Sequence, residues 1–178
     1  MITPVALQAR SKLRNYLNSI LRSPVSEAGS ENRRCPMKIE NILATKGSNV
    51  VTARAKQSLK QAIDLLVEFN IGALVVTDEA GKPVGIISER DLIRAVARGE
   101  DVHTRLVSDV MTKKVIVASP QDDLESVMQT MTVKRFSHLP VMDKGKLIGI
   151  VSIGDIVKAQ LSQYRGEIET LETQIIGE

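Results

Sequence analysis

The sequence predicts an α/β fold of the α+β kind, in which two strand–helix–strand–strand–helix (βαββα) units pack together. One observation is a repeated motif of Gly, two aliphatic residues, Ser, two variable residues and Asp, which occurs at 85–91 (GIISERD) and at 149–155 (GIVSIGD). Matching periodic segments surround both copies, which indicates an internal repeat. The length of 178 residues accommodates two units of roughly 60 residues each.

The opening of each unit is a short helical turn followed by a short strand. Residues 39–43 (IENIL) match residues 107–111 (VSDVM), and the β-branched segment 50–52 (VVT) matches 115–117 (VIV). Because β-branched residues favour strands, both segments are predicted as strands.

An amphipathic helix follows in each unit. One apolar face in 58–69 contains Leu59, Ala62, Ile63 and Leu66, and one in 123–133 contains Leu124, Val127, Met128 and Met131. Such spacing predicts faces buried in a core rather than contacts with a cofactor. The core must be aliphatic, since aromatic residues are 2% of the chain and Trp is absent.

Two strands and a second helix complete each unit. The strands are predicted at 73–76 and 84–87, then at 138–141 and 147–151, with the turn sequences DEAGKP and DKGK between them. Asp and Gly in these turns favour hairpins. Helices are predicted over 89–98, stopped by Gly99, and from 153 onward. Neither unit covers its own sheet, so we expect the two to pack face to face with pseudo-twofold symmetry.

The last helix continues beyond the end of its counterpart in the first unit. Its apolar residues are spaced 4, 3, 4, 3 and 4 positions apart, as in a heptad repeat; they are Val157, Leu161, Tyr164, Ile168, Leu171 and Ile175. This seam either folds back on its own body or associates with a second copy. We favour a homodimer, because the seam extends two turns past the matching helix.

The predicted domain organisation is a basic extension at 1–36, expected to be disordered, repeats at 37–104 and 105–160, and a helical extension at 161–178. The extension contains six Lys/Arg and two Glu. Its amphipathic, acid-free beginning resembles a transit peptide, but we favour a short extension or a misread upstream start codon, with Met37 opening the protein. We expect a cytoplasmic protein, with the mitochondrial matrix as the alternative.

Composition argues against several classes of function. The net charge of +3 comes from the basic extension, and no basic stripe interleaved with aromatics is present, so nucleic acid is not an expected partner. Cys35 is the single Cys, which fits a reducing compartment and predicts no disulfide framework. No stretch approaches the ~18 consecutive apolar residues of a membrane span, so no membrane insertion is expected.

The repeated motif has two chemical interpretations. Ser88 and Asp91 have the spacing of a capping box, which does no more than start a helix. The same atoms also suit a nucleotide, because a helix start with a hydroxyl binds phosphate and a carboxylate one turn later accepts both ribose hydroxyls.

The duplicated whole resembles the tandem cystathionine β-synthase (CBS) domain pair. The resemblance covers residues 37 to about 160 and includes IGALVV and VGIISERDL in one copy, and FSHLPV and IGIVSIGDI in the other. It implies two βαββα units with two clefts for adenosine-containing ligands such as AMP, ATP, NAD or S-adenosylmethionine. It also implies dimerisation and the regulation of another protein, which the sequence does not identify.

The resemblance assigns site residues in both copies. It places Asp91 and Asp155 on ribose and Ser88 and Ser152 on phosphate, and Arg90 and Arg135 are further candidates for phosphate because arginine can grip it bidentately. The adenine pocket would be held or lined by Thr52, Ile71, Gly72, Ala73, Val117, Phe136, Ser137, His138 and Pro140.

The two copies differ at two positions. Arg90 is matched by Gly154, so we expect weaker or different phosphate binding at the second motif unless Arg135 substitutes. Pro140 is the family's commoner residue in its strand, where the first copy has Val75.

The leading hypothesis is a stand-alone sensor of AMP, ATP or NAD, with no catalytic cofactor. The rival is an interaction or scaffold module with degenerate clefts. An enzyme is not expected, since no nucleophile–base pair is visible. His103 and His138 have no partners at metal-ligand spacing, so no metal site is predicted.

Overall fold

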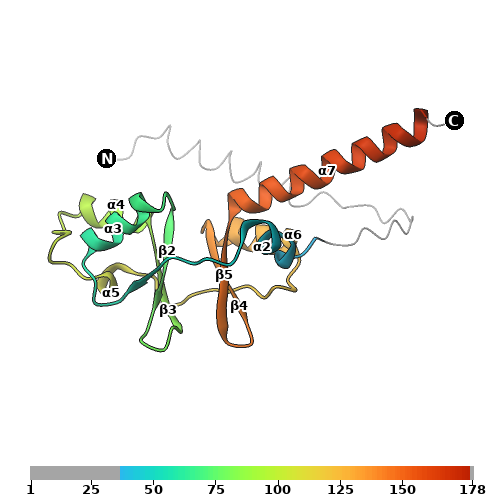
Figure 1. Cartoon of the computed structure of the whole chain (residues 1–178). Helices are drawn as coiled ribbons and strands as arrows, with labels where there is room; N and C mark the ends of the chain where they lie inside the picture. Colours follow the sequence, from blue (N-terminus) through green and yellow to red (C-terminus); the bar gives the residue numbers. More distant parts are fainter. Residues whose placement is uncertain (1–36, 177–178) are drawn as a thin grey trace, which may run out of the picture. The chain divides into compact units, whose positions relative to one another are not determined.

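The computed structural model describes residues 37–176, with side chains described up to 170 and at 172 and 173. Figure 1 traces the described chain from α2 to α7. The predictions for residues 1–36, including the basic extension and Cys35, lie outside these residues, as do those for the side chains of Leu171 and Ile175.

The first half contains the predicted strand–helix–strand–strand–helix order. Strand β1 (Thr52–Arg54) runs parallel to β2 (Ala73–Thr77), which pairs antiparallel with β3 (Pro83–Ser88). Helices α3 (Leu59–Glu68) and α4 (Glu89–Ala97) follow β1 and β3 respectively. Ser58 starts α3 by accepting a hydrogen bond from the backbone N–H of Gln61, as expected of an N-cap serine.

The second half contains the same order except for its opening strand. Helix α6 (Leu124–Lys134), strands β4 (His138–Asp143) and β5 (Lys146–Ser152) and helix α7 (Ile153–Ile176) match the predictions. The strand predicted at 115–117 is wrong, because only an isolated parallel bridge between Ala118 and Val141 forms there. Pro140 lies opposite this segment and has no N–H to donate to a longer ladder.

The opening helix of each repeat packs against the other half. Helix α2 (Ile39–Lys46) buries Ile39 and Ile42 in the core formed by α6, β4 and β5, whereas α5 (Val107–Val110) buries Val107 in the core of the first half. Reciprocal backbone hydrogen bonds fix this exchange: Ile39 N–H donates to Asp122 O at 3.1 Å, and Val107 N–H donates to Gln57 O at 2.9 Å. Each half therefore depends on a segment from the other repeat.

This exchange explains the glycine that begins each repeated motif. A Cβ atom at Gly85 would lie 2.4 Å from Met111 Sδ, and one at Gly149 would lie 2.5 Å from Leu43 Cδ2. Neither glycine has a positive φ. The motif therefore begins with Gly because the other repeat's opening segment approaches the strand closely at that point.

The predicted core faces are buried. Leu59, Ala62 and Leu66 of α3 are buried, as are Leu124, Val127 and Met131 of α6, while Ile63 and Met128 pack partly buried against the same two clusters.

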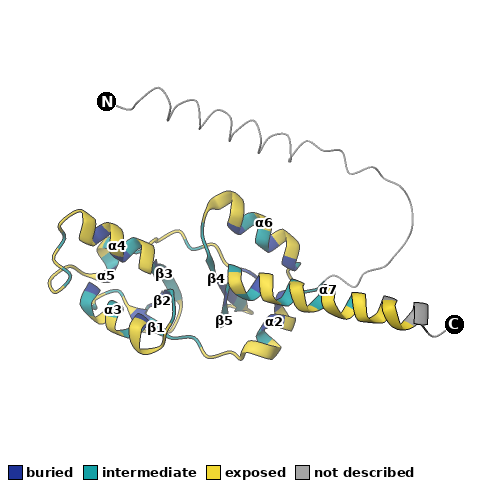
Figure 2. Cartoon of the chain, turned by 90° about the horizontal axis from the view of Figure 1, so that it is seen from above, coloured by how far each residue is buried: buried dark blue, intermediate teal, exposed yellow. Residues whose placement is uncertain are grey.

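Helix α7 is exposed along most of its length, as Figure 2 shows. Within the described chain, Val157, Leu161, Tyr164 and Ile168 are 44–55% exposed, so these seam residues do not fold back on their own body. No helix among residues 37–176 is both long and apolar enough to cross a membrane.

Candidate nucleotide-binding cleft

One cleft of about 960 Å³ is lined by both halves. The first half contributes Gly72, Ile86, Ser88, Glu89, Arg90, Asp91, Ile93 and Arg94; the segment after α5 contributes Thr112, Lys114 and Ile116; and the second half contributes Lys134, Arg135, Phe136, Ser137, His138 and Pro140. The predicted residues that meet here are Gly72, Ser88, Arg90, Asp91, Arg135, Phe136, Ser137, His138 and Pro140. The first motif therefore shares a cleft with the second repeat's 135–140 segment.

The first motif forms the junction between β3 and α4 at the edge of this cleft. Asp91 Oδ2 accepts hydrogen bonds from the backbone N–H of Ser88 at 3.0 Å and from its hydroxyl at 2.7 Å. Both residues are half-buried. Asp91 thus caps the Ser88 N–H as a capping box requires, and the start of α4 faces a cleft, where a helix N-terminus can also hold an anion.

Positive charge dominates the cleft lining, which carries five cationic side chains and two carboxylates. Arg90 Nη1 donates to the backbone carbonyl of Arg135 at 3.3 Å and so links α4 to the end of α6. Arg135 ends α6 in the left-handed region, with φ 59° and ψ 42°. That conformation is uncommon for residues other than Gly, Asn and Asp, and Asn70 occupies it at the matching position of the first repeat.

The second motif forms the matching junction between β5 and α7 but has a different environment. Asp155 Oδ2 accepts from the Ser152 N–H at 2.7 Å and hydroxyl at 2.8 Å, and also from Lys46 Nζ at 2.6 Å. Burial alone would raise the pKa of Asp155, but hydrogen bonds from Lys46 and Ser152 outweigh it and lower that pKa below its ordinary value. The second carboxylate is therefore already paired with a cation.

His138 lies near both motifs. A Cβ atom at Gly72 would lie 3.0 Å from its Cε1 atom, and its pairing partner in β5 is Ser152. Burial lowers the pKa of His138, and the positive charge of Lys46 adds to this, whereas Glu89 and Asp155 act in the opposite direction. Burial of His138 therefore favours its neutral imidazole form.

Four predicted adenine-pocket residues do not line this cleft. Thr52 lies in β1 opposite Val75, and Ala73 is buried in β2 opposite Ser88. Ile71 packs against the first half's core, and Val117 is 46% exposed. Their predicted roles at the two sites remain predictions.

Sequence reasoning missed several lining residues. Thr112, Lys114 and Ile116 enter the cleft because α5 crosses to the first half, and Lys134 enters because α6 ends there. The sequence does show that the two lysines occupy matching positions of the repeats, because Lys46 lies three residues after Leu43 and Lys114 lies three residues after the matching Met111.

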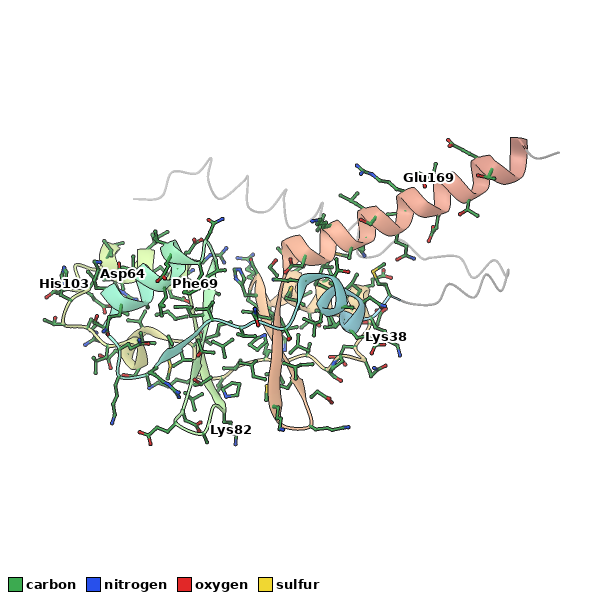
Figure 3. All side chains as sticks on the ribbon, in the orientation of Figure 1. Lys38, Asp64, Phe69, Lys82, His103 and Glu169 are labelled. Carbon is green, nitrogen blue, oxygen red and sulfur yellow. The ribbon has the colours of Figure 1, made fainter. Side chains whose placement is uncertain are left out.

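The histidines do not form a metal site within residues 37–176, where no group of three or more potential His, Cys, Asp or Glu ligands comes together. Figure 3 shows His103 on the loop between α4 and α5, at the outer edge of the first half.

The fold and the cleft define a tandem-repeat α/β module in which a βαββα repeat and an αββα repeat exchange their opening helices and share a cleft at the start of α4. The chain belongs to the CBS domain family, whose model matches residues 40–98 and 107–162.

Known proteins resemble the chain over most of the described region. It is 32% identical over 148 residues to "CBS domain-containing protein CBSX3, mitochondrial" of Arabidopsis thaliana, covering 78% of this chain and 72% of that protein. Among solved structures, the CBS-domain containing protein ATU1752 from Agrobacterium tumefaciens matches with a TM-score of 0.68 and 42% identity, covering 70% of this chain and 99% of that one.

A third comparison includes ligands. The CBS domain pair of protein MJ0100, solved in complex with 5'-methylthioadenosine and S-adenosyl-L-methionine, matches with a TM-score of 0.65 and 29% identity over 72% of this chain and 98% of that one. At least one structural relative therefore binds adenosine-containing ligands.

Proposed function

We propose that the protein is a regulatory module that binds an adenine nucleotide of the AMP, ATP or NAD type and signals its occupancy to another protein. The observation that carries this proposal is the meeting, in one cleft, of the Ser88–Asp91 helix start with five cationic side chains. The adenosine ligands of the MJ0100 domain pair support it.

The cleft has suitable dimensions and chemistry for such a ligand. Its volume of about 960 Å³ lies near the upper end of the roughly 300–1,000 Å³ usual for small-molecule pockets. In the proposed complex, Asp91 accepts hydrogen bonds from the ribose hydroxyls. The phosphates lie between the start of α4 and the guanidinium groups of Arg90 and Arg135, since arginine can form bidentate hydrogen bonds with phosphate.

The charge of the lining favours phosphates over neutral or cationic adenosine ligands. Five cations against two carboxylates attract a polyanion, and the attraction between exposed charges weakens as salt is added. We therefore expect ATP and ADP to bind more tightly than AMP, and AMP more tightly than S-adenosylmethionine or adenosine.

Signalling follows from the position of the cleft. A ligand that contacts both α4 and the 135–140 segment binds best to one arrangement of the two halves, and such differential affinity is what shifts a conformational equilibrium. Regulation, rather than catalysis, is therefore the proposed role, with a homodimer formed through α7 as the signalling unit. The compartment is proposed to be the cytoplasm, with the mitochondrial matrix as the alternative that the relative named mitochondrial supports.

A ligand panel on the purified protein tests the proposal. A nucleotide at 100 times its Kd stabilises the folded state by about 2.7 kcal/mol, which corresponds to a rise in melting temperature of roughly 5–10 °C for a chain of this size. No shift with AMP, ADP, ATP, NAD or S-adenosylmethionine would refute the sensor and leave the scaffold interpretation.

A matched pair of variants separates ligand binding from helix capping. Asp91→Ala removes a cap and a proposed ribose ligand, whereas Asp123→Ala removes only a cap, because Asp123 starts α6 by accepting from the Ser126 N–H at 2.9 Å and does not line the cleft. Each substitution costs roughly 0.5–2 kcal/mol of stability as a lost cap. Only Asp91→Ala should also abolish the nucleotide-dependent shift; an equal shift in both variants would show that nucleotide binding does not depend on Asp91.

A further inference from the structure

Lys46 is the last residue of α2 and reaches the second motif from the other repeat. Its ammonium group donates to Asp155 Oδ2 at 2.6 Å and to the Ile150 carbonyl at 3.2 Å. The Lys46 side chain is 41% exposed and that of Asp155 is 25% exposed, so the pair lies at the surface of the second junction, where a ligand would have to approach.

The matching lysine of the first junction is placed differently. Lys114 lines the large cleft, and among residues 37–176 it makes no salt bridge. Helix α5 ends at Val110, so the chain beyond it is extended and forms a two-way backbone bridge between Thr112 and Ile86. Helix α2 continues to Lys46, and the lysine side chain, instead of the backbone, reaches the carbonyl of Ile150, the counterpart of Ile86.

The second junction also has less positive charge for a ligand. Gly154 stands where the first motif has Arg90, and Lys46 is already bound to the one carboxylate of the motif. Ribose hydroxyls would form weaker hydrogen bonds with a carboxylate that an ammonium group already neutralises. If a phosphate drew Lys46 away from Asp155, the phosphate and the carboxylate would repel each other.

We propose that Lys46 is an internal occupant of the second site, which restricts the protein to one nucleotide per chain, bound at Asp91. This inference rests on the proposed nucleotide-binding function and adds to it a device that selects between the two sites. A ligand reaches Asp155 only when Lys46 leaves it, and the length of α2 determines that Lys46 stays.

Isothermal titration calorimetry with ATP, repeated with AMP, tests the proposal. The wild-type chain should bind one nucleotide per chain, and Lys46→Met should bind two, with the second lost again in the double variant Lys46→Met and Asp155→Asn. Lys46→Gln, which keeps a donor for the Ile150 carbonyl but removes the charge, should also bind two and serves if the Met variant does not fold. Lys114→Met is the matched control and should still bind one nucleotide, more weakly.

The outcomes distinguish the two proposals. Unchanged stoichiometry in a folded Lys46 variant, or two nucleotides already bound by the wild type, would overturn the role of Lys46 and leave the proposed function intact. Weaker binding at an Asp155-dependent site in the Lys46 variants would also overturn it, because Lys46 would then be a ligand contact. A wild-type chain that binds no nucleotide would overturn the proposed function, and the role of Lys46 with it.

Discussion

Replacing Gly149 by Ala tests the exchange of opening helices that builds both halves. The new Cβ atom would lie 2.5 Å from Leu43 Cδ2 and 3.2 Å from Leu43 Cδ1, so Leu43 or the whole of α2 must shift. Overpacking of this kind costs about 1–3 kcal/mol, offset by the ~0.5–1 kcal/mol that Ala gains over Gly within a strand. The difference between these two ranges is a net loss of about 0–2.5 kcal/mol, or at most roughly 10 °C in melting temperature.

Thermal denaturation followed by circular dichroism measures this change, with Gly154→Ala as the control. A Cβ atom at Gly154 meets only Ser152 Oγ at an ordinary 3.6 Å, and Ala is favoured in a helix, so this variant should gain up to about 1 kcal/mol. Adding Leu43→Ala to Gly149→Ala should lose less stability than the two single losses together, because each relieves the other's crowding. Strict additivity of Gly149→Ala with Leu43→Ala would refute the packing of α2 on β5.

Two further predictions concern pH and assembly. Burial lowers the pKa of His138, so below the ordinary value of about 6.5 the unfolded chain binds more protons than the folded chain, and the free energy of unfolding falls as pH decreases. In His138→Gln, the free energy of unfolding measured in urea should depend less on pH between pH 6.5 and 5. An unchanged pH dependence would contradict this. A chain ending at Gln160 loses the α7 residues Leu161, Tyr164 and Ile168, which are exposed in the single copy, and should have a smaller mass by light scattering than the full chain; equal masses would place the interface elsewhere.

Local signals account for the elements that were predicted correctly. The helix starts at Ser58 and Asp123 each depend on a side chain that accepts a hydrogen bond from the backbone N–H three residues later. Both partners lie within four consecutive residues, so the sequence alone indicates them. The hairpins β2–β3 and β4–β5 likewise turn at Gly81 and Gly145, whose φ angles are positive. Hydrophobic periodicity then identified the buried faces of α3 and α6, because burial of a helix face has the period of the helix.

Relations between distant residues account for what was missed. Nothing local to 107–110 indicates that α5 packs on the first half, so Thr112 and Lys114 were not assigned to the cleft at Asp91. The opening strand at 115–117 was predicted from β-branched composition, but its formation depends on the N–H that Pro140 lacks. In both cases the outcome depends on residues of another element, more than twenty positions away in the sequence: the core of the first half for α5, and Pro140 for the strand.

The inequality of the two motifs was predicted from Arg90 and Gly154, but the structure gives it a second cause. Between the matched positions Lys46 and Val50 the chain has three extra residues, 47–49, which are absent between Lys114 and Val115. Those residues let α2 continue for a full turn beyond the point where α5 stops and end at Gly47, whose φ of 88° suits glycine. Because that extra turn carries Lys46 to Asp155, a three-residue difference in one linker is sufficient to make two copies of the same helix start chemically different.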